Sequence, residues 1–207
     1  SGVNVHLVLE EYQAEQDWAH GSHAGPQLFL FSARTPESLL RSLDEHADRM
    51  RKSDPGHALE DLAYTLQVST EPMEHRLAIV AASHGELLQL LARAKKLMTD
   101  NRPVDGNGPI FIGTVQPRDS RRLLDVIKAQ ISEEKLLDNL RSGQLKEIAL
   151  LWTSGIDMPW DGYWREIATN RRHRSEIQPR LVDAVPYPFS MKRFWLDFDT
   201  VETELPA

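Results

Sequence analysis

A stretch near the C-terminus, Pro186–Leu196 (PYPFSMKRFWL), places the strongest constraint on how this chain folds. Its two prolines lack backbone donors and favour extended backbone in the residues before them. The stretch fits neither a helix nor a strand period. We therefore predict an extended strap that lies on a surface built elsewhere. Its aromatic anchors carry too much apolar surface to be left in water: Tyr187, Phe189, Phe194 and Trp195.

Composition excludes several classes of function. Of the 207 residues, 41% are hydrophobic, which is enough for a core, and the net charge of −7 argues against nucleic acid as a partner. The absence of cysteine excludes disulfides, thiolate metal sites and cysteine nucleophiles, and it fits a reducing, cytoplasmic compartment. No apolar run approaches the roughly 20 residues that a membrane helix needs, so we predict no membrane contact.

Apolar periodicity predicts one compact unit over residues 27–115. Short apolar runs read as strands, and the segments between them show helical spacing with clear start signals at Thr35 and Ser83. The predicted fold class is α/β of the α+β kind, a small three-stranded sheet packed by helices. The expected strands span 28–32, 75–82 and 110–115, and the expected helices span 36–51, 59–66 and 84–99.

The segments outside this unit differ in character. Residues 3–9 read as a strand with no partner nearby, so we expect it to belong to the sheet of another domain, in a chain cut from a longer polypeptide. Helical spacing returns over about 119–152 and dissolves from Met158 onward. The predicted organisation is a foreign strand, a linker, the compact unit, a helical segment and an extended strap: 1–13, 14–26, 27–115, 116–168 and 169–207.

Candidate catalytic groups do not form a site in the sequence. His20 and His23 stand in a Gly- and Ser-rich stretch that favours a linker, and His6 on its strand favours a hydrogen-bonded core histidine. No Gly-x-Ser-x-Gly elbow or glycine-rich phosphate loop is present. The acids that stand among the aromatic residues, Asp157, Asp161 and Glu166, are interpreted as solvated or helix-capping groups. We therefore predict no catalytic, cofactor-binding or metal site.

Four segments together resemble a known family in its own order. Ser1–Glu11 (SGVNVHLVLEE) resembles the C-terminal end of a polyketide synthase ketosynthase domain, and Asp61–Ala78 looks like the signature of the linker domain that follows it. Leu151–Trp160 (LWTSGIDMPW) is similar to the family's Leu-Trp-x-x-Gly-x-x-x-x-Trp segment. The strap resembles the family's Pro-Thr-Tyr-Pro-Phe ending, although Ala184-Val185-Pro186 replaces the usual Leu-Pro-Thr. The resemblance implies that some of its anchors rest on the ketosynthase, so we expect residues beyond about Pro186 to pack poorly or to borrow a neighbouring molecule.

The layout narrows the resemblance further. About 40 residues of helix join the third strand to the Leu-Trp segment, where many synthases insert an acyltransferase domain. This layout resembles the ketosynthase-flanking subdomain, or acyltransferase docking domain, of trans-acyltransferase synthases. The resemblance implies three partners and no cofactor: a ketosynthase in cis, a separate trans-acting acyltransferase, and a phosphopantetheinylated acyl carrier protein.

We therefore expect a non-catalytic structural and docking subdomain. Arg93, Lys95 and Lys96 are candidates to meet the acidic face of a carrier protein, although each also fits a solvated helix face. Two alternatives stay open, namely self-association through the charged helices of residues 119–141 and a remnant acyltransferase enzyme. The candidate structural and interface residues are His6, Tyr64, Arg76, Trp152, Trp160, Tyr187, Pro188, Phe189, Phe194 and Trp195.

Overall fold

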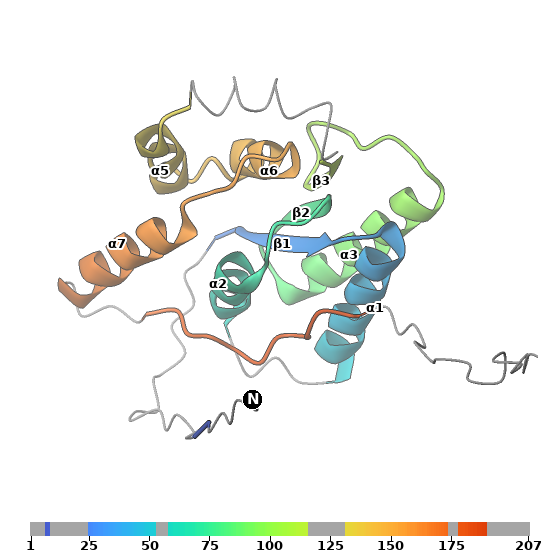
Figure 1. Ribbon diagram of the computed structural model, residues 1–207, viewed down its shortest axis with the longest axis horizontal. Helices are drawn as coiled ribbons and strands as arrows, with labels where there is room; N and C mark the ends of the chain where they lie inside the picture. Colours follow the sequence, from blue (N-terminus) through green and yellow to red (C-terminus); the bar gives the residue numbers. More distant parts are fainter. Residues whose placement is uncertain (1–6, 9–24, 53–57, 116–130, 174–177, 190–207) are drawn as a thin grey trace, which may run out of the picture.

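A computed structural model describes residues 7–8, 25–52, 58–115, 131–173 and 178–189. Its centre is a three-stranded antiparallel sheet in the order β1-β2-β3 (Figure 1). Phe29 pairs with Ile79, and Leu77 pairs with Ile112, so β2 lies in the middle. The predicted three-stranded sheet is confirmed, with β1 at Gln27–Ala33, β2 at His75–Ala81 and β3 at Ile110–Thr114.

Three helices fill the connections between these strands: α1 (Pro36–Lys52), α2 (Leu59–Ser69) and α3 (His84–Thr99). At the start of α1, the Ser38 amide donates to Thr35 Oγ1 at 3.2 Å. At the start of α3, the Glu86 amide donates to Ser83 Oγ at 3.1 Å. Both caps satisfy amides that a helix leaves unpaired in its first turn. The predicted start signals are therefore confirmed.

One face of the sheet carries the larger core. Side chains alternate between the two faces of a strand, so every second strand residue points to the same side. Helices α1, α2 and α3 cover this face with leucines spaced three or four residues apart. The buried side chains of this core include Phe29, Phe31, Leu39, Leu43, Leu62, Leu66, Leu77, Ile79, Leu87, Leu91 and Ile110.

The other face of the sheet packs against helices from later in the chain, α5 (Glu133–Arg141) and α6 (Leu145–Thr153). Leu28 and Leu30 of β1 point to this face, which explains why β1 has a continuous apolar run rather than an alternating one. Gly113 lets α6 approach closely, because a Cβ there would lie 2.0 Å from the Thr153 carbonyl oxygen.

Helical spacing was expected to dissolve from Met158 onward, and this was wrong, because a further helix, α7 (Trp160–His173), forms there. The helical segment predicted over 116–168 covers only the first part of this helix. Trp160, Tyr163, Trp164 and Ile167 recur at the spacing of one helical face. Aromatic residues and Gly162 have low intrinsic helix propensity, so packing rather than local preference forms this helix.

The chain after α7 continues as an extended segment, residues 178–189, which we call the strap segment. It runs from the end of α7 past α2 towards α1 (Figure 1). Of the strand expected over 3–9, the structure describes Leu7 and Val8, which are exposed and belong to no strand. The helix expected over 119–130 and the strap beyond Phe189 lie outside the described residues. Within the described ranges, no helix combines the length and apolarity needed to cross a membrane.

The outer edge of β1 faces α2 rather than another strand. Gln67 Nε2 donates to the Leu28 carbonyl oxygen at 2.8 Å, and the Thr70 hydroxyl lies 3.4 Å from the Leu30 carbonyl oxygen. These side chains take the place of a neighbouring strand, because an edge strand otherwise exposes unpaired backbone groups.

Candidate functional site

Helix α2 has an unusual face of four buried polar side chains. Burying polar groups is unfavourable unless each finds a hydrogen-bond partner. In this protein the partners come from α7, β1 and the strap segment, which are distant in sequence. The four residues are Glu60, Asp61, Thr65 and Gln67, each between 4% and 6% exposed.

Glu60 forms a buried ion pair with Arg171 of α7. Arg171 Nη2 lies 2.5 Å from Glu60 Oε1, and Nη1 lies 3.1 Å from Oε2, so the pair is bidentate. The side chains are 5% and 11% exposed. Burial raises the pKa of the nearby Tyr163, and the charge of Glu60 adds to that shift. This pair fixes the far end of α7 against the start of α2.

Asp61 and Thr65 hold the strap segment by its main chain. The Arg180 amide donates to Asp61 Oδ1 at 3.0 Å, and the Val182 amide donates to Thr65 Oγ1 at 2.9 Å. Two residues of extended chain rise about 6.6 Å, and four residues of helix rise about 6.0 Å, so these two spacings match. Helix α2 thus binds alternate amides of the strap segment, largely independently of its side chains.

Gln67 and Tyr64 join α7 to the sheet. Gln67 donates to β1, and its Oε1 accepts from Trp164 Nε1 at 2.9 Å. The rings of Tyr64 and Trp164 meet edge to face, with centroids 5.0 Å apart. Tyr64 therefore lies in the junction of α2 with α7. We call the contacts of Glu60, Asp61, Tyr64, Thr65 and Gln67 with α7 and the strap segment the α2 junction.

Arg76 and Trp152, both predicted as structural residues, come together where α6 packs against β2. The Arg76 guanidinium lies 5.2 Å from the Trp152 ring centroid and donates to the Trp152 carbonyl oxygen at 2.9 Å. It also pairs with Asp157 Oδ1 at 3.2 Å. Burial lowers the pKa of Arg76, and Asp157 opposes that shift. This contact ties the end of α6 to β2.

Trp160 lies at the start of α7, half-buried against the core that the sheet forms with α5 and α6. The acids near it do not form a pair. Glu166 accepts hydrogen bonds from Arg141, which lower the pKa of its carboxyl group, while Asp157 pairs with Arg76. In the part of the chain that the structure describes, no three His, Cys, Asp or Glu side chains group closely enough to hold a metal ion. His6, Phe194 and Trp195 lie outside that part.

The end of the strap segment packs on its own chain. The Tyr187 hydroxyl accepts from the Arg34 amide at 3.2 Å, and its ring packs on the larger core. Pro188 is buried, whereas Phe189 is 72% exposed. The expectation of poor packing beyond about Pro186 was thus wrong for Tyr187, which packs on the larger core, and for Pro188, which is buried. It is confirmed for Phe189, the last residue described.

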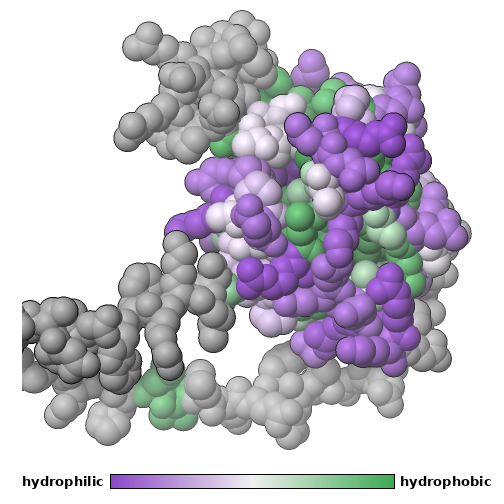
Figure 2. Space-filling model, turned by 90° about the vertical axis from the view of Figure 1, so that its right-hand side faces the viewer, coloured by the Kyte–Doolittle hydropathy of each residue, from purple (hydrophilic) through white to green (hydrophobic). Residues whose placement is uncertain are grey.

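The predicted docking cations on α3 separate into two environments. Lys95 is paired with Asp44 of α1, with Nζ 2.7 and 2.8 Å from the two carboxylate oxygens. Arg93 and Lys96 instead line a shallow groove of about 360 Å³, which Arg102 joins from the loop after α3. We call these three residues the cationic groove; none of them forms an ion pair with any residue that the structure describes. Figure 2 shows that hydrophilic residues dominate the face on the α1 and α3 side.

Sequence reasoning missed the roles of the polar residues of α2, of Arg171 and of Arg102. In the sequence, the polar positions of α2 look like an ordinary solvated helix face, since nothing local shows that α7 and the strap segment cover them. Arg102 follows the helix in a loop, where no periodic signal exists. We find no local signal that would have identified either group.

Comparisons with known proteins agree with this architecture. Residues 30–96 match the family described as "RhiE-like, KS-MAT linker domain". The polyketide synthase PksL of Bacillus subtilis is 29% identical over all of this chain, and ThaQ of Burkholderia thailandensis is 40% identical over 94% of it. The chain spans only 4% and 8% of these two proteins.

Solved structures show the same fold. A ketosynthase from module 6 of the Bacillus subtilis bacillaene synthase matches 90% of this chain with a TM-score of 0.63 and 25% identity. The match covers 28% of that protein, which means that the ketosynthase structure includes a subdomain of this kind. Residues 30–96 of this chain therefore match the RhiE-like KS-MAT linker family, and the chain as a whole is similar to segments of polyketide synthases.

Proposed function

We propose that this chain is a non-catalytic scaffold of a trans-acyltransferase polyketide synthase, which holds its C-terminal strap in a fixed position beside a ketosynthase in cis. The observation that carries this proposal is the α2 junction. Through Glu60, Asp61, Thr65 and Gln67, one short helix holds β1, α7 and the strap segment together. A buried, fully partnered polar network specifies one geometry more strictly than an apolar contact does.

The trans-acyltransferase part of the proposal rests on chain length. Residues 115–132 join β3 to α5, and this connection is far shorter than the roughly 50 residues of the smallest ordinary domains. No acyltransferase domain fits there, so extender units would come from a separate acyltransferase. The lack of cysteine suits a cytoplasmic enzyme of this kind.

The scaffold role is tested in a ketosynthase fused to this chain. We expect the ketosynthase to melt several degrees higher than one that ends at residue 13, and to condense its substrates faster. The fused variant Glu60→Ala, which breaks the α2 junction, should lose part of both gains. The chain alone should not hydrolyse or transfer acyl groups from an acyl-CoA. Equal melting temperatures and equal condensation rates with and without residues 14–207 would contradict the scaffold role.

A second function, docking of an acidic carrier protein, is favoured by the cationic groove. Arg93 and Lys96 are three residues apart on α3, so they share one face, and Arg102 lies beside them. Three cations that form no ion pair with any described residue favour an anionic partner surface. Such contacts mainly speed association and weaken as salt rises.

Docking is tested by titrating the full chain with a phosphopantetheinylated carrier protein and following amide chemical shifts. Reversing all three charges (Arg93→Glu, Lys96→Glu, Arg102→Glu) should weaken binding by about tenfold or more. Lys95→Gln is the matched control, because it removes a cation from the same helix but outside the groove. A triple variant that binds as well as the parent chain would exclude docking at this groove while leaving the scaffold role intact. A free-standing acyltransferase is tested in the same way.

A further inference from the structure

The strap segment roofs a second site, which lies apart from the cationic groove. This cavity has a volume of about 680 Å³, within the range of small-molecule sites in proteins. Apolar side chains line it from the body of the protein and from the strap segment; we call Phe31 and Leu66 its floor, and Tyr187 and Phe189 its roof. Hydroxyl groups from three elements line its walls: Ser32, Thr35, Ser38, Ser42, Ser69 and Thr70.

One wall group of this cavity has an unmet hydrogen-bonding need. His46 is 6% exposed, and its ring meets Phe31 edge to face at 5.1 Å. Nδ1 lies 2.8 Å from the Ser42 carbonyl oxygen, which can only accept, so Nδ1 carries the proton. Nε2 is then an acceptor, and it has no partner among the described residues. A buried polar atom left unpaired lowers stability by about 1–3 kcal/mol, so Nε2 is expected to accept from a hydrogen-bond donor.

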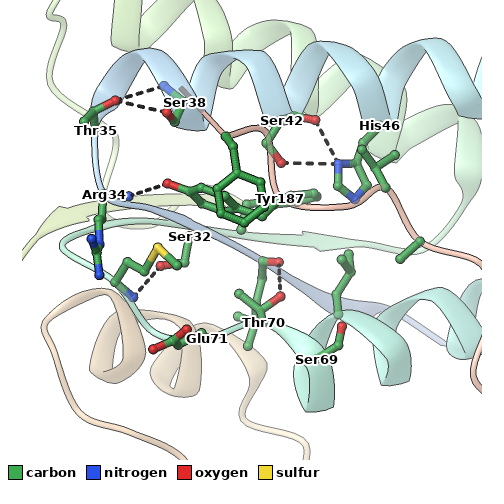
Figure 3. A pocket seen from close by; sticks show the side chains of 17 residues that line it. Ser32, Arg34, Thr35, Ser38, Ser42, His46, Ser69, Thr70, Glu71 and Tyr187 are labelled. Atoms are coloured by element: carbon green, nitrogen blue, oxygen red, sulfur yellow. Dashed lines mark hydrogen bonds between the residues drawn. The ribbon is translucent and has the colours of Figure 1, made fainter. Parts of the chain in front are cut away.

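Two hydroxyl groups of the cavity have the opposite need. Ser32 Oγ accepts from the Met73 amide at 2.7 Å, and the Tyr187 hydroxyl accepts from the Arg34 amide. Within the described part of the chain, neither hydroxyl proton has an acceptor. In Figure 3 the Tyr187 ring crosses the space between Arg34 and His46. The cavity, whose lining also includes the oppositely charged Arg34 and Glu71, thus has two hydroxyl donors and one ring-nitrogen acceptor without partners among the described residues.

We propose that this cavity binds a neutral chain that contains a secondary amide. The amide N–H would donate to His46 Nε2, its carbonyl oxygen would accept from Ser32 or Tyr187, and its apolar part would lie on Phe31 and Leu66. Such amides occur in a pantetheine arm and in an extended peptide, and the experiment separates these two sources. Because Nε2 is buried under the roof, ligand entry should displace the strap segment at Tyr187. The site stands on the cavity's own groups and needs neither proposed function.

The test is an NMR titration of the ¹⁵N-labelled full chain with three probes. Pantetheine and N-acetyl-alanyl-alanine N-methylamide carry secondary amides, and triethylene glycol is the control without one. We expect saturable shifts at Ser32, His46 and Tyr187 with at least one amide probe. The unprotonated ring nitrogen of His46 should move to lower ppm as it accepts a hydrogen bond. A response to pantetheine alone identifies the arm as the source, and a response to the dipeptide alone identifies a peptide.

Two variants make the assignment specific. His46→Phe keeps an aromatic ring against Phe31 but removes the acceptor, and Tyr187→Phe keeps the roof but removes a donor. Each should weaken binding of the amide probe by about fivefold, the equivalent of one net hydrogen bond. An unchanged amide spectrum away from the cavity confirms that each variant is folded. The proposal is overturned if neither amide probe gives saturable shifts, if triethylene glycol binds equally well, or if both variants bind like the parent chain.

Discussion

The sheet core and the α2 junction are buried to a similar degree, but their chemistry is opposite. Phe29 and Leu77 in the core are completely buried among apolar neighbours, while Glu60 and Gln67 in the junction are 5% and 6% exposed among polar ones. Apolar contacts are non-directional, so neighbours can partly repack after a change. Each hydrogen bond in the junction instead needs its own partner at a fixed distance. The core therefore supplies stability, and the junction determines where α7 and the strap segment lie.

The largest loss of stability should come from Trp152→Ala, on the face of the sheet that packs against α5 and α6. Trp152 is 2% exposed and stacks on Arg76, so its removal leaves a cavity and a less well-packed guanidinium. We expect a loss of about 4 kcal/mol in the free energy of unfolding, measured by urea denaturation. Leu150→Ala on the same helix is the control, because Leu150 is 56% exposed and should change little. Equal losses in the two variants would contradict the assignment of Trp152 to the core.

The second largest loss of stability is expected in the α2 junction, where it distinguishes a polar contact from the apolar core. Glu60→Ala leaves Arg171 buried without its carboxylate, and we expect a loss of about 3 kcal/mol. Replacing both partners, as Glu60→Leu with Arg171→Met, should recover most of that loss, because an apolar pair leaves no charge unpaired. Glu134→Ala is the control, since Glu134 pairs with Arg141 on the surface and should matter little. A double variant as unstable as Glu60→Ala would show that the junction is not a simple ion pair.

A smaller effect is expected from Thr65→Val, which removes one hydroxyl and keeps the shape of the side chain. The Val182 amide then loses its acceptor, at a cost of about 1 kcal/mol. Hydrogen exchange at the Val182 amide should accelerate more than exchange at Leu77 in the sheet. Thr169→Val, at an exposed position of α7, serves as the control. Uniform acceleration across the chain would mean that the strap segment does not open separately.

The smallest expected effect is a loss of stability at acidic pH through His46. Burial lowers the pKa of His46 below its ordinary value, and the charge of Arg49 adds to the shift. The unfolded chain then binds a proton near pH 6.5 that the folded chain resists. Stability from this group is complete above about pH 6.5 and falls as the pH drops towards the lower folded pKa. Urea denaturation across this range should show the decline, and His46→Phe should flatten it. A parent curve as flat as that of His46→Phe would refute the assignment.

The sequence allowed most of the core to be predicted, because apolar spacing directly reflects which face of an element is buried. Strands β1, β2 and β3 and helices α1 and α3 were found in this way. Helix α7 was missed, since its aromatic face was read as an irregular segment. The α2 junction could not be predicted, because Asp61 and Thr65 bind the main-chain amides of Arg180 and Val182. Every residue except proline has such an amide, so the sequence does not indicate which ones are bound.

The side chains of α2 that cover the edge of β1 have a consequence for assembly. Gln67 and Thr70 occupy carbonyl groups to which another strand would otherwise bind. Proteins that carry such a subdomain are very long, since this chain spans only 4% to 8% of PksL and ThaQ. Within such a polypeptide, many strands are present at high local concentration while each domain folds. A sheet whose first edge is already occupied cannot take up a passing strand there, so this subdomain is protected from mispairing during synthesis.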